Sequence, residues 1–375
     1  MSVRLHDVII SLELPPGVVA SDALLGTSWP INTEVGDFTL HLPGASLLRG
    51  HDGEAQPELQ QPDVNEQVQG AVHHLAEAED DHGWRWSYWG GVTGWNTSDG
   101  RVLSATVSHA VVSCCGPTGD RSSKRDWFEG ATHALNEWAR RFTRWLEVLA
   151  LKDHGDDRPP SVSVNNRLGL ALFVNNEGTG GEWVSPIRGP TVVVRADHDP
   201  IAAEVWEDAV RRANRSALIP ESHRYLSRAY VAMNRGDRRR AVIDAATGVE
   251  IALATDVRRL LTNSTTASVA TLLKNQRGVV ELFDLHAALS GAESVSRASV
   301  LDRIAGPRNL SVHEGHEPDA EMAKRCLALS TSLIEQVDPL RTSPPNATSH
   351  RPDTVGDVRG AGCASEEVSS SASDS

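Results

Sequence analysis

The stretch that decides the fold is Arg238–Leu261, which reads RRRAVIDAATGVEIALATDVRRLL. Its apolar residues recur every three or four positions: Val242, Ala246, Val249, Leu253, Val257 and Leu260. This spacing places all of them on one face of an α-helix. The stretch therefore predicts a long helix that packs one apolar face into a core.

The same helical periodicity continues on both sides of this stretch. Further helices are expected at His198–Arg215, Glu221–Asn234, Ser268–Lys274, Gly278–Leu289, Val295–Ala305 and Asp319–Val337. No strand signal interrupts them. Residues 200–340 therefore predict an all-α domain, a bundle of four or more helices.

Residues 1–199 have a different pattern. β-Branched and aromatic residues alternate with turn residues at Val3–Leu14, Asp37–Leu42, Trp84–Val92, Arg101–Ser113, Leu168–Val174 and Pro190–Arg195. One strong helix is expected at Lys124–Leu151, packed against the sheet. The predicted fold class is α+β in two domains, a β-rich domain over 1–199 and a helical bundle over 200–340.

The last segment, residues 341–375, is rich in Ser, Thr, Pro and Gly and ends EEVSSSASDS. Its few apolar side chains cannot offset the entropy that ordering would cost. We expect a disordered tail.

Charge is unevenly distributed along the 375 residues. Lys and Arg number 36 against 50 Asp and Glu, a net charge of −14. Residues 1–199 carry 15 basic and 27 acidic side chains, whereas residues 200–340 carry 18 of each. This balance excludes a protein that coats nucleic acid by bulk attraction. Any contact with phosphate must be local, and the second domain is the better candidate for it.

The cysteines and the N-terminus bear on the compartment. The cysteines are Cys114, Cys115, Cys326 and Cys363, without CxxC spacing and too few for a disulfide scaffold. The first 14 residues mix charges into their apolar positions, unlike a signal peptide, and no run approaches 18 apolar residues. We expect a cytoplasmic protein without a membrane partner.

One short segment combines residues suited to chemistry on a phosphate. It is Gly306–Gly315, GPRNLSVHEG, where Gly-Pro is expected to end one helix and open the next. Arg308, Asn309 and His313 then lie within two helical turns. Arginine binds phosphate oxygens with a fork of donors, and histidine moves a proton near neutral pH. An arginine and a histidine are a minimal apparatus for phosphodiester cleavage.

This segment resembles a known motif. RNLSVH at Arg308–His313 is similar to the RxxxxH signature of the HEPN superfamily (higher eukaryotes and prokaryotes nucleotide-binding). Upstream, Gly236-Asp237 followed by AVIDAATGVE at Ala241–Glu250 resembles the early HEPN helix, in which a turn precedes an A-V-x-x-A-x-x-x-x-E run. The resemblance covers roughly residues 220–338, and the first half resembles no family.

The resemblance implies a metal-independent endoribonuclease that needs no cofactor. His313 activates the RNA 2′-hydroxyl or protonates the leaving oxygen, and Arg308 stabilises the phosphorane. Asn309 holds His313 or a phosphate oxygen, and Glu250 orients Arg308 from the facing helix. The products are a cyclic phosphate and a 5′-hydroxyl. The alternative for Glu250 is a surface carboxylate that pairs with Arg258 or another basic neighbour.

Helix geometry adds an expectation about assembly. Five residues on a regular helix rotate by about 140°, so Arg308 and His313 do not share a face unless the first turn is distorted. HEPN domains commonly pair with their motifs juxtaposed, which implies a homodimer through this domain. A β-rich region followed by HEPN also resembles abortive-infection and toxin-type effectors of antiviral defence. A partner antitoxin or a phage-derived trigger then restrains or releases the activity.

Several alternatives stay open. The cluster Trp84, Trp86, Trp89 and Trp95 is either a stacking surface for a ligand or one face of a buried strand. Two histidine groups, His313 with His316 and His73, His74 and His82 beside Asp80 and Asp81, lack a full metal-ligand set, so no metal is expected. The basic run Arg235 and Arg238–Arg240 is a solvated helix start or a phosphate contact. The whole protein is alternatively a non-catalytic RNA-binding or dimerisation scaffold.

Overall fold

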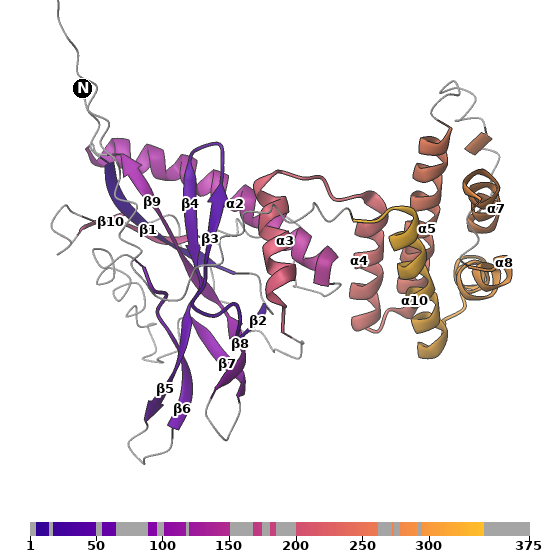
Figure 1. Cartoon of the computed structure of the whole chain (residues 1–375), viewed down its shortest axis with the longest axis horizontal. Helices are drawn as coiled ribbons and strands as arrows, with labels where there is room; N and C mark the ends of the chain where they lie inside the picture. The colour runs from indigo at the N-terminus through magenta and orange to yellow at the C-terminus, as the bar shows by residue number, and fades with distance from the viewer. Residues whose placement is uncertain are drawn as a thin grey trace, which may run out of the picture. The chain divides into compact units, whose positions relative to one another are not determined.

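A computed structural model of the chain describes residues 5–14, 18–49, 55–64, 89–95, 101–117, 120–150, 168–174, 181–184, 200–261, 272–273, 278–291 and 295–340. The described residues form two compact units (Figure 1). The first contains the residues up to Thr143 and those from 168 to Ser216, and the second contains Arg144–Ala150 and Ala217–Leu340. Strands dominate the first region and helices the second, which confirms the α+β class. The expected tail, 341–375, lies outside the described residues.

The first unit is built on a six-stranded antiparallel sheet with the order β11-β10-β1-β9-β4-β3. These strands are β1 (Leu5–Glu13), β3 (Ser28–Asn32), β4 (Asp37–His41), β9 (His109–Pro117), β10 (Leu168–Val174) and β11 (Gly181–Val184). β1 lies between β9 and β10, and its Val8, Ile9 and Ile10 are fully buried. Consecutive buried side chains point to opposite faces, so both faces of this strand are covered.

Two smaller antiparallel sheets complete the strands of this unit. One has the order β2-β8-β7 (Val19–Ser21, Val102–Val107 and Gly90–Trp95), and the other pairs β5 (Gly44–Arg49) with β6 (Ala55–Gln60). The expected single strand at Arg101–Ser113 is in fact two, β8 and β9, divided at Ser108, whose backbone N–H donates to Trp89 O. The expected strand Pro190–Arg195 lies outside the described residues.

Helix α2 (Arg121–Ala150) confirms the helix expected at Lys124–Leu151. Its Trp138 stacks on Phe142, and Phe142 meets Trp206 of α3 (Ala203–Asn214) edge to face, with centroids 4.7 Å apart. Asn214 accepts from Trp138 Nε1 and donates to Pro30 O of β3. These contacts place α3 in the first unit, so the boundary lies at Ser216/Ala217, whereas we predicted it at residue 200.

The tryptophan cluster is described only in part. Trp89 is 5 % exposed and packs with Ile9, Leu59 and Val111. Trp89 is therefore a core residue and not part of an exposed stacking surface. Trp84 and Trp86 lie outside the described residues.

The second unit is a helical bundle arranged around α5 (Figure 1). Its helices are α4 (Glu221–Asn234), α5 (Arg238–Leu260), α7 (Val279–Ser290), α8 (Arg297–Val300), α9 (Gly306–His313) and α10 (Ala320–Val337). The predicted apolar stripe of α5 is confirmed, because Val242, Ala246, Val249, Leu253 and Val257 are buried and Leu260 is half-buried. Of the helix expected at Ser268–Lys274, only residues 272 and 273 are described. None of the described helices is both long and apolar enough to cross a bilayer.

The predicted helix break at Gly306-Pro307 is wrong. α8 continues through a π-helical turn, η1 (Leu301–Ala305), into α9. Proline has no N–H, and its ring crowds the carbonyl four residues earlier, so a regular α-turn is strained there. The wider turn relieves this crowding, with Gly306 N bonded to Leu301 O, five residues back. A Cβ on Gly306 would lie 3.1 Å from that same oxygen, which favours glycine.

Candidate functional site

Helix α9 carries three of the four predicted site residues. Its buried side chains, Pro307 and Ser311, face the bundle, where α9 packs on α5, η1 and α10. Arg308 is half-buried, whereas Asn309 and His313 are exposed. Asn309 and His313 therefore reach solvent, and Arg308 does so in part.

Arg308 has one hydrogen bond and one electrostatic partner. Its Nη1 donates to Asn309 Oδ1 at 3.2 Å. Against the larger effect of burial, its positive charge lowers the pKa of the Glu250 carboxyl of α5. No ion pair within 4 Å involves Arg308 among the residues that the structure describes. Its charge is therefore only partly neutralised by Glu250.

The environment of Glu250 shifts its pKa. Burial raises the pKa of this carboxyl, the positive charge of Arg308 opposes the shift, and Glu281 of α7 reinforces it. Glu250 of α5 is thus within electrostatic range of Glu281 of α7 and of Arg308 of α9. The alternative pairing of Glu250 with Arg258 has no ion pair to support it in the described part of the chain. The sequence reasoning missed Glu281, because nothing in its spacing links it to residues 31 and 27 positions away.

Asn309 connects the two ends of the motif. Residues four apart share a face of a helix, so Asn309 and His313 lie on the same side of α9. The Arg308 guanidinium is hydrogen-bonded to the side chain of Asn309, which lies on that side. The interval from Arg308 to His313 is regular helix, and the π-turn lies before it, so this interval lacks the distortion that would bring the two backbone positions onto one face. The structure pairs Asn309 with Arg308; it shows no hydrogen bond from Asn309 to His313.

The start of α5 lies against the end of α9. Arg239 Nε donates to Ser311 O at 3.0 Å, and Arg238 Nη1 donates to Pro318 O at 3.5 Å. A hollow of about 270 Å³ opens beside them; it is lined by Asp237, Arg239, Arg240, Ile243 and Asp244. The basic run named from the sequence is thus next to the motif, although 72 residues separate Arg239 from Ser311.

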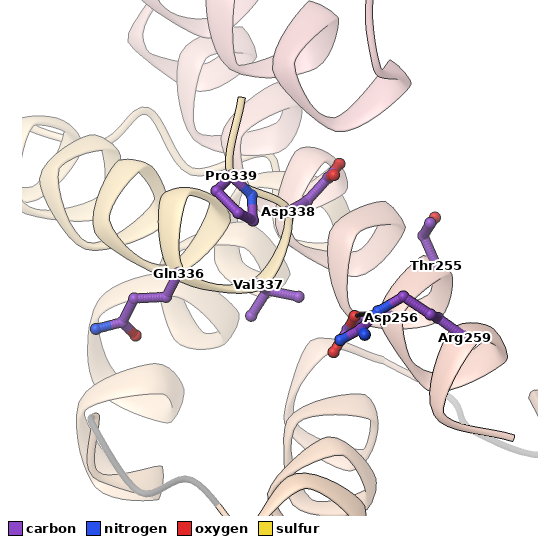
Figure 2. A pocket seen from close by; sticks show the side chains of 7 residues that line it. All are labelled: Thr255, Asp256, Arg259, Gln336, Val337, Asp338 and Pro339. Carbon is purple, nitrogen blue, oxygen red and sulfur yellow. Dashed lines mark hydrogen bonds and ion pairs between the residues drawn. The ribbon is translucent and has the colours of Figure 1, made fainter. Parts of the chain in front are cut away.

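A second hollow, of about 290 Å³, lies where α5 and α10 end (Figure 2). It is lined by Thr255, Asp256, Arg259, Gln336, Val337, Asp338 and Pro339. Figure 2 shows Arg259 beside Asp256, with the Asp338 carboxylate directed away from them. Asp256 accepts from Arg259 Nε at 2.6 Å and bonds to His286 Nε2 at 3.0 Å. The Asp338 carboxylate accepts from Ser222 Oγ at 2.6 Å.

Asp256, Arg259 and Asp338, which line this second hollow, are therefore already engaged in hydrogen bonds. Burial raises the pKa of Asp256, but the hydrogen bonds from Arg259 and His286 outweigh it, so the pKa lies below the ordinary value for aspartate. This network of hydrogen bonds joins α5 to α7, and stabilising that packing is sufficient to account for it. Sequence reasoning did not single it out, because buried Asp and His on separate helices carry no spacing signal.

Metal ligands do not gather in the described part of the chain. No group of three or more His, Cys, Asp or Glu side chains there is arranged to hold a metal ion. Of the two histidine groups considered from the sequence, His73, His74 and His82 lie outside the described residues.

No family model, curated protein or solved structure gives a significant match to the chain. The functional argument therefore rests on the residues around α9.

Proposed function

We propose that the second unit is a HEPN-like bundle and that the protein is a metal-independent endoribonuclease. The observation that carries the proposal is the placement of Arg308: its guanidinium is bonded to Asn309, on the side of α9 that exposes His313. Both groups needed for phosphodiester cleavage are then accessible on one short helix. The resemblance of Arg308–His313 and Ala241–Glu250 to HEPN elements supports the same reading.

The cleavage step uses the RNA itself as nucleophile. A neutral imidazole of His313 takes the proton of the 2′-hydroxyl, and the 2′-oxygen attacks the adjacent phosphorus. A bond from O2′ to phosphorus forms, the bond from phosphorus to O5′ breaks, and a protonated imidazole returns a proton to O5′. The products are a cyclic phosphate and a 5′-hydroxyl. Arg308 stabilises the charge that builds on the phosphorane oxygens, and Glu250 positions its guanidinium.

A homodimer completes this proposal. A two-fold axis beside α9 juxtaposes two copies of the motif, so that one His313 acts as base and the other as acid. Exposed apolar side chains on this helical segment, Leu301 and Val312, are 49 % and 39 % exposed and suit such an interface. Size-exclusion chromatography with light scattering tests it. A strict monomer at micromolar concentration contradicts the dimer.

The test of cleavage is direct. Purified protein is incubated with tRNA and mixed RNA in EDTA, beside Arg308→Ala and His313→Ala. Removing one charge-stabilising donor or one proton-transfer group typically lowers a rate by about 10²- to 10³-fold, and we expect losses of that size. Arg325→Ala is the matched control, since Arg325 is an exposed arginine of α10 paired with Glu321. Equal products from wild type and both motif variants would exclude this mechanism.

A second candidate is a non-catalytic RNA-binding or dimerisation scaffold. The observation in its favour is the Glu250 carboxylate, because a guanidinium that already faces an acid offers less charge to a phosphorane. RNA binding without cleavage in the experiment above supports this candidate. For either activity we propose a cytoplasmic effector of antiviral defence, of the toxin type, controlled by an antitoxin or a phage-derived trigger.

A further inference from the structure

The arginines of the second unit fall into two groups. Five of those that the structure describes pair with a carboxylate: Arg224 with Glu221, Arg240 with Asp244, Arg259 with Asp256, Arg297 with Asp284 and Arg325 with Glu321. Arg238 and Arg239 make no ion pair within 4 Å with any described residue, and instead bond to backbone carbonyls at and beyond the end of α9. Two arginines without a carboxylate partner therefore lie against α9 and the chain that follows it.

Arg239 is the better placed of the two. It is exposed, and its Nε bond to Ser311 O fixes the guanidinium two residues before His313 in the chain. A guanidinium has five N–H donors, and this bond uses one of them. The donors that remain can bind an oxyanion beside the last turn of α9, the turn that carries His313.

The acids around Arg239 are mostly occupied. Asp237 accepts from the Arg240 backbone N–H as the N-cap of α5, and Asp244 accepts from Arg240 Nε. Asp319 caps α10 by accepting from Met322 N. Glu314 and Glu317 are exposed in the chain that follows α9. Asp237 already occupies the N-terminus of α5, so the donors available to an anion are those of the Arg239 side chain and not the helix N–H groups.

We propose that Arg239 binds the RNA phosphate next to the scissile one, and so directs the strand past His313. The inference rests on the proposed function and names a substrate-positioning residue for it. The hollow lined by Asp237, Arg239, Arg240, Ile243 and Asp244 leaves room for that phosphate beside the guanidinium.

The experiment separates binding from cleavage. Binding of a fluorescent single-stranded RNA to the full chain carrying His313→Ala is measured by anisotropy over a series of KCl concentrations. Adding Arg239→Ala is expected to weaken binding about five- to tenfold, equally for unrelated RNA sequences, and to reduce the slope of log affinity against log salt by about 0.7–1. Arg239→Lys keeps the charge and is expected to keep most of that slope. Arg325→Ala is expected to change neither.

Cleavage kinetics on the wild-type background complete the test. A contact made equally in the ground and transition states raises KM and leaves kcat nearly unchanged, which is the result expected for Arg239→Ala. If the Arg239→Ala variant keeps the affinity and the salt slope measured without that substitution, the inference about Arg239 is overturned. The proposed nuclease function is unaffected by that result. A fall in kcat with unchanged KM also overturns the inference, because it places Arg239 on the reacting phosphate. If the His313→Ala chain binds no RNA and wild type cleaves none, the proposed function fails as well.

Discussion

Replacing Gly248 by alanine tests the packing that positions the site. Gly248 lies in the middle of α5, two residues before Glu250. A Cβ added there would lie 2.9 Å from Ser222 O of α4, 3.1 Å from Ile334 Cδ1 of α10 and 3.5 Å from Tyr225 Cβ. The nearest atom is backbone, so it cannot rotate away, and α4 and α5 must separate.

The expected magnitude is a balance of two effects. Alanine in place of glycine inside a helix gains up to about 1 kcal/mol from propensity, whereas forcing a methyl group into a packed core costs about 1–3 kcal/mol. Because the contact is with backbone, we expect the cost to win and the second unit to lose about 1–2 kcal/mol. Gly130→Ala is the matched control: Gly130 is an exposed glycine in α2 with nothing within 4 Å of its added Cβ, so it should gain about 0.5–1 kcal/mol.

The assay has to resolve the two units, since one transition midpoint is ill-defined for a chain of several units. Native-state hydrogen exchange of amides in α4 and α5 reports the second unit, and those in α2 report the control. If the α5 amides of the Gly248→Ala variant are protected from hydrogen exchange as well as or better than those of wild type, the reasoning is refuted. If cleavage is observed, the variant should also be slower, because separating α4 from α5 moves Glu250 relative to Arg308.

Three further predictions concern ionisation. Glu250→Gln is expected to stabilise the protein at pH 7 by less than about 1 kcal/mol, since the half-exposed carboxyl is screened by solvent. Burial raises the folded-state pKa of Glu250, so the gain in stability is absent below the unfolded-state pKa and grows as pH rises through the folded-state pKa. Denaturation at several pH values that shows no such dependence contradicts this prediction. Asp256→Asn is expected to destabilise by about 1–3 kcal/mol at neutral pH, because His286 and Arg259 lose a buried acceptor. The folded-state pKa of Asp256 is lowered, so its stabilisation is present above the unfolded value and is lost as pH falls through the folded one; a deficit that stays constant in acid would argue against this. Burial raises the pKa of the Cys326 thiol to about 12, so we expect iodoacetamide at pH 8 to modify Cys326 only when the second unit unfolds. Peptide mass spectrometry should show Cys326 modified later than the half-buried Cys114. Rapid labelling of Cys326 in the native protein would refute its burial.

The sequence predicted the elements best where one face of a helix is continuously apolar. The stripe of α5 and the aromatic face of α2 repeat over many turns, so their periodicity outweighs local exceptions. At Gly306-Pro307 a local rule failed, because a π-turn accommodates a proline without ending the helix. α3 was assigned to the wrong unit for a different reason: its periodicity is helical, but only tertiary contacts of Trp206 and Asn214 show which core it joins.

The candidate site shows the same division. Arg308, Asn309 and His313 are close in sequence, so a single helix, α9, carries all three. Glu250 was placed from the resemblance, and the structure brings its charge to Arg308. Glu281 and the Arg239–Ser311 contact depend on how α5, α7 and α9 pack, and no spacing in the sequence encodes that packing.

A net charge of −14 restricts how this chain could hold RNA. Long-range attraction is unfavourable, so affinity must come from short-range contacts that are strong within about one Debye length, roughly 8 Å at physiological salt. Arg238, Arg239 and Arg308 have no carboxylate within 4 Å among the described residues, and they lie on or against a single helix, α9. The negative charge of Glu250 reduces the pull of Arg308 on any anion, which favours a ligand that engages several of these cations at once. A strand with successive phosphates meets that requirement better than an isolated phosphate ion does.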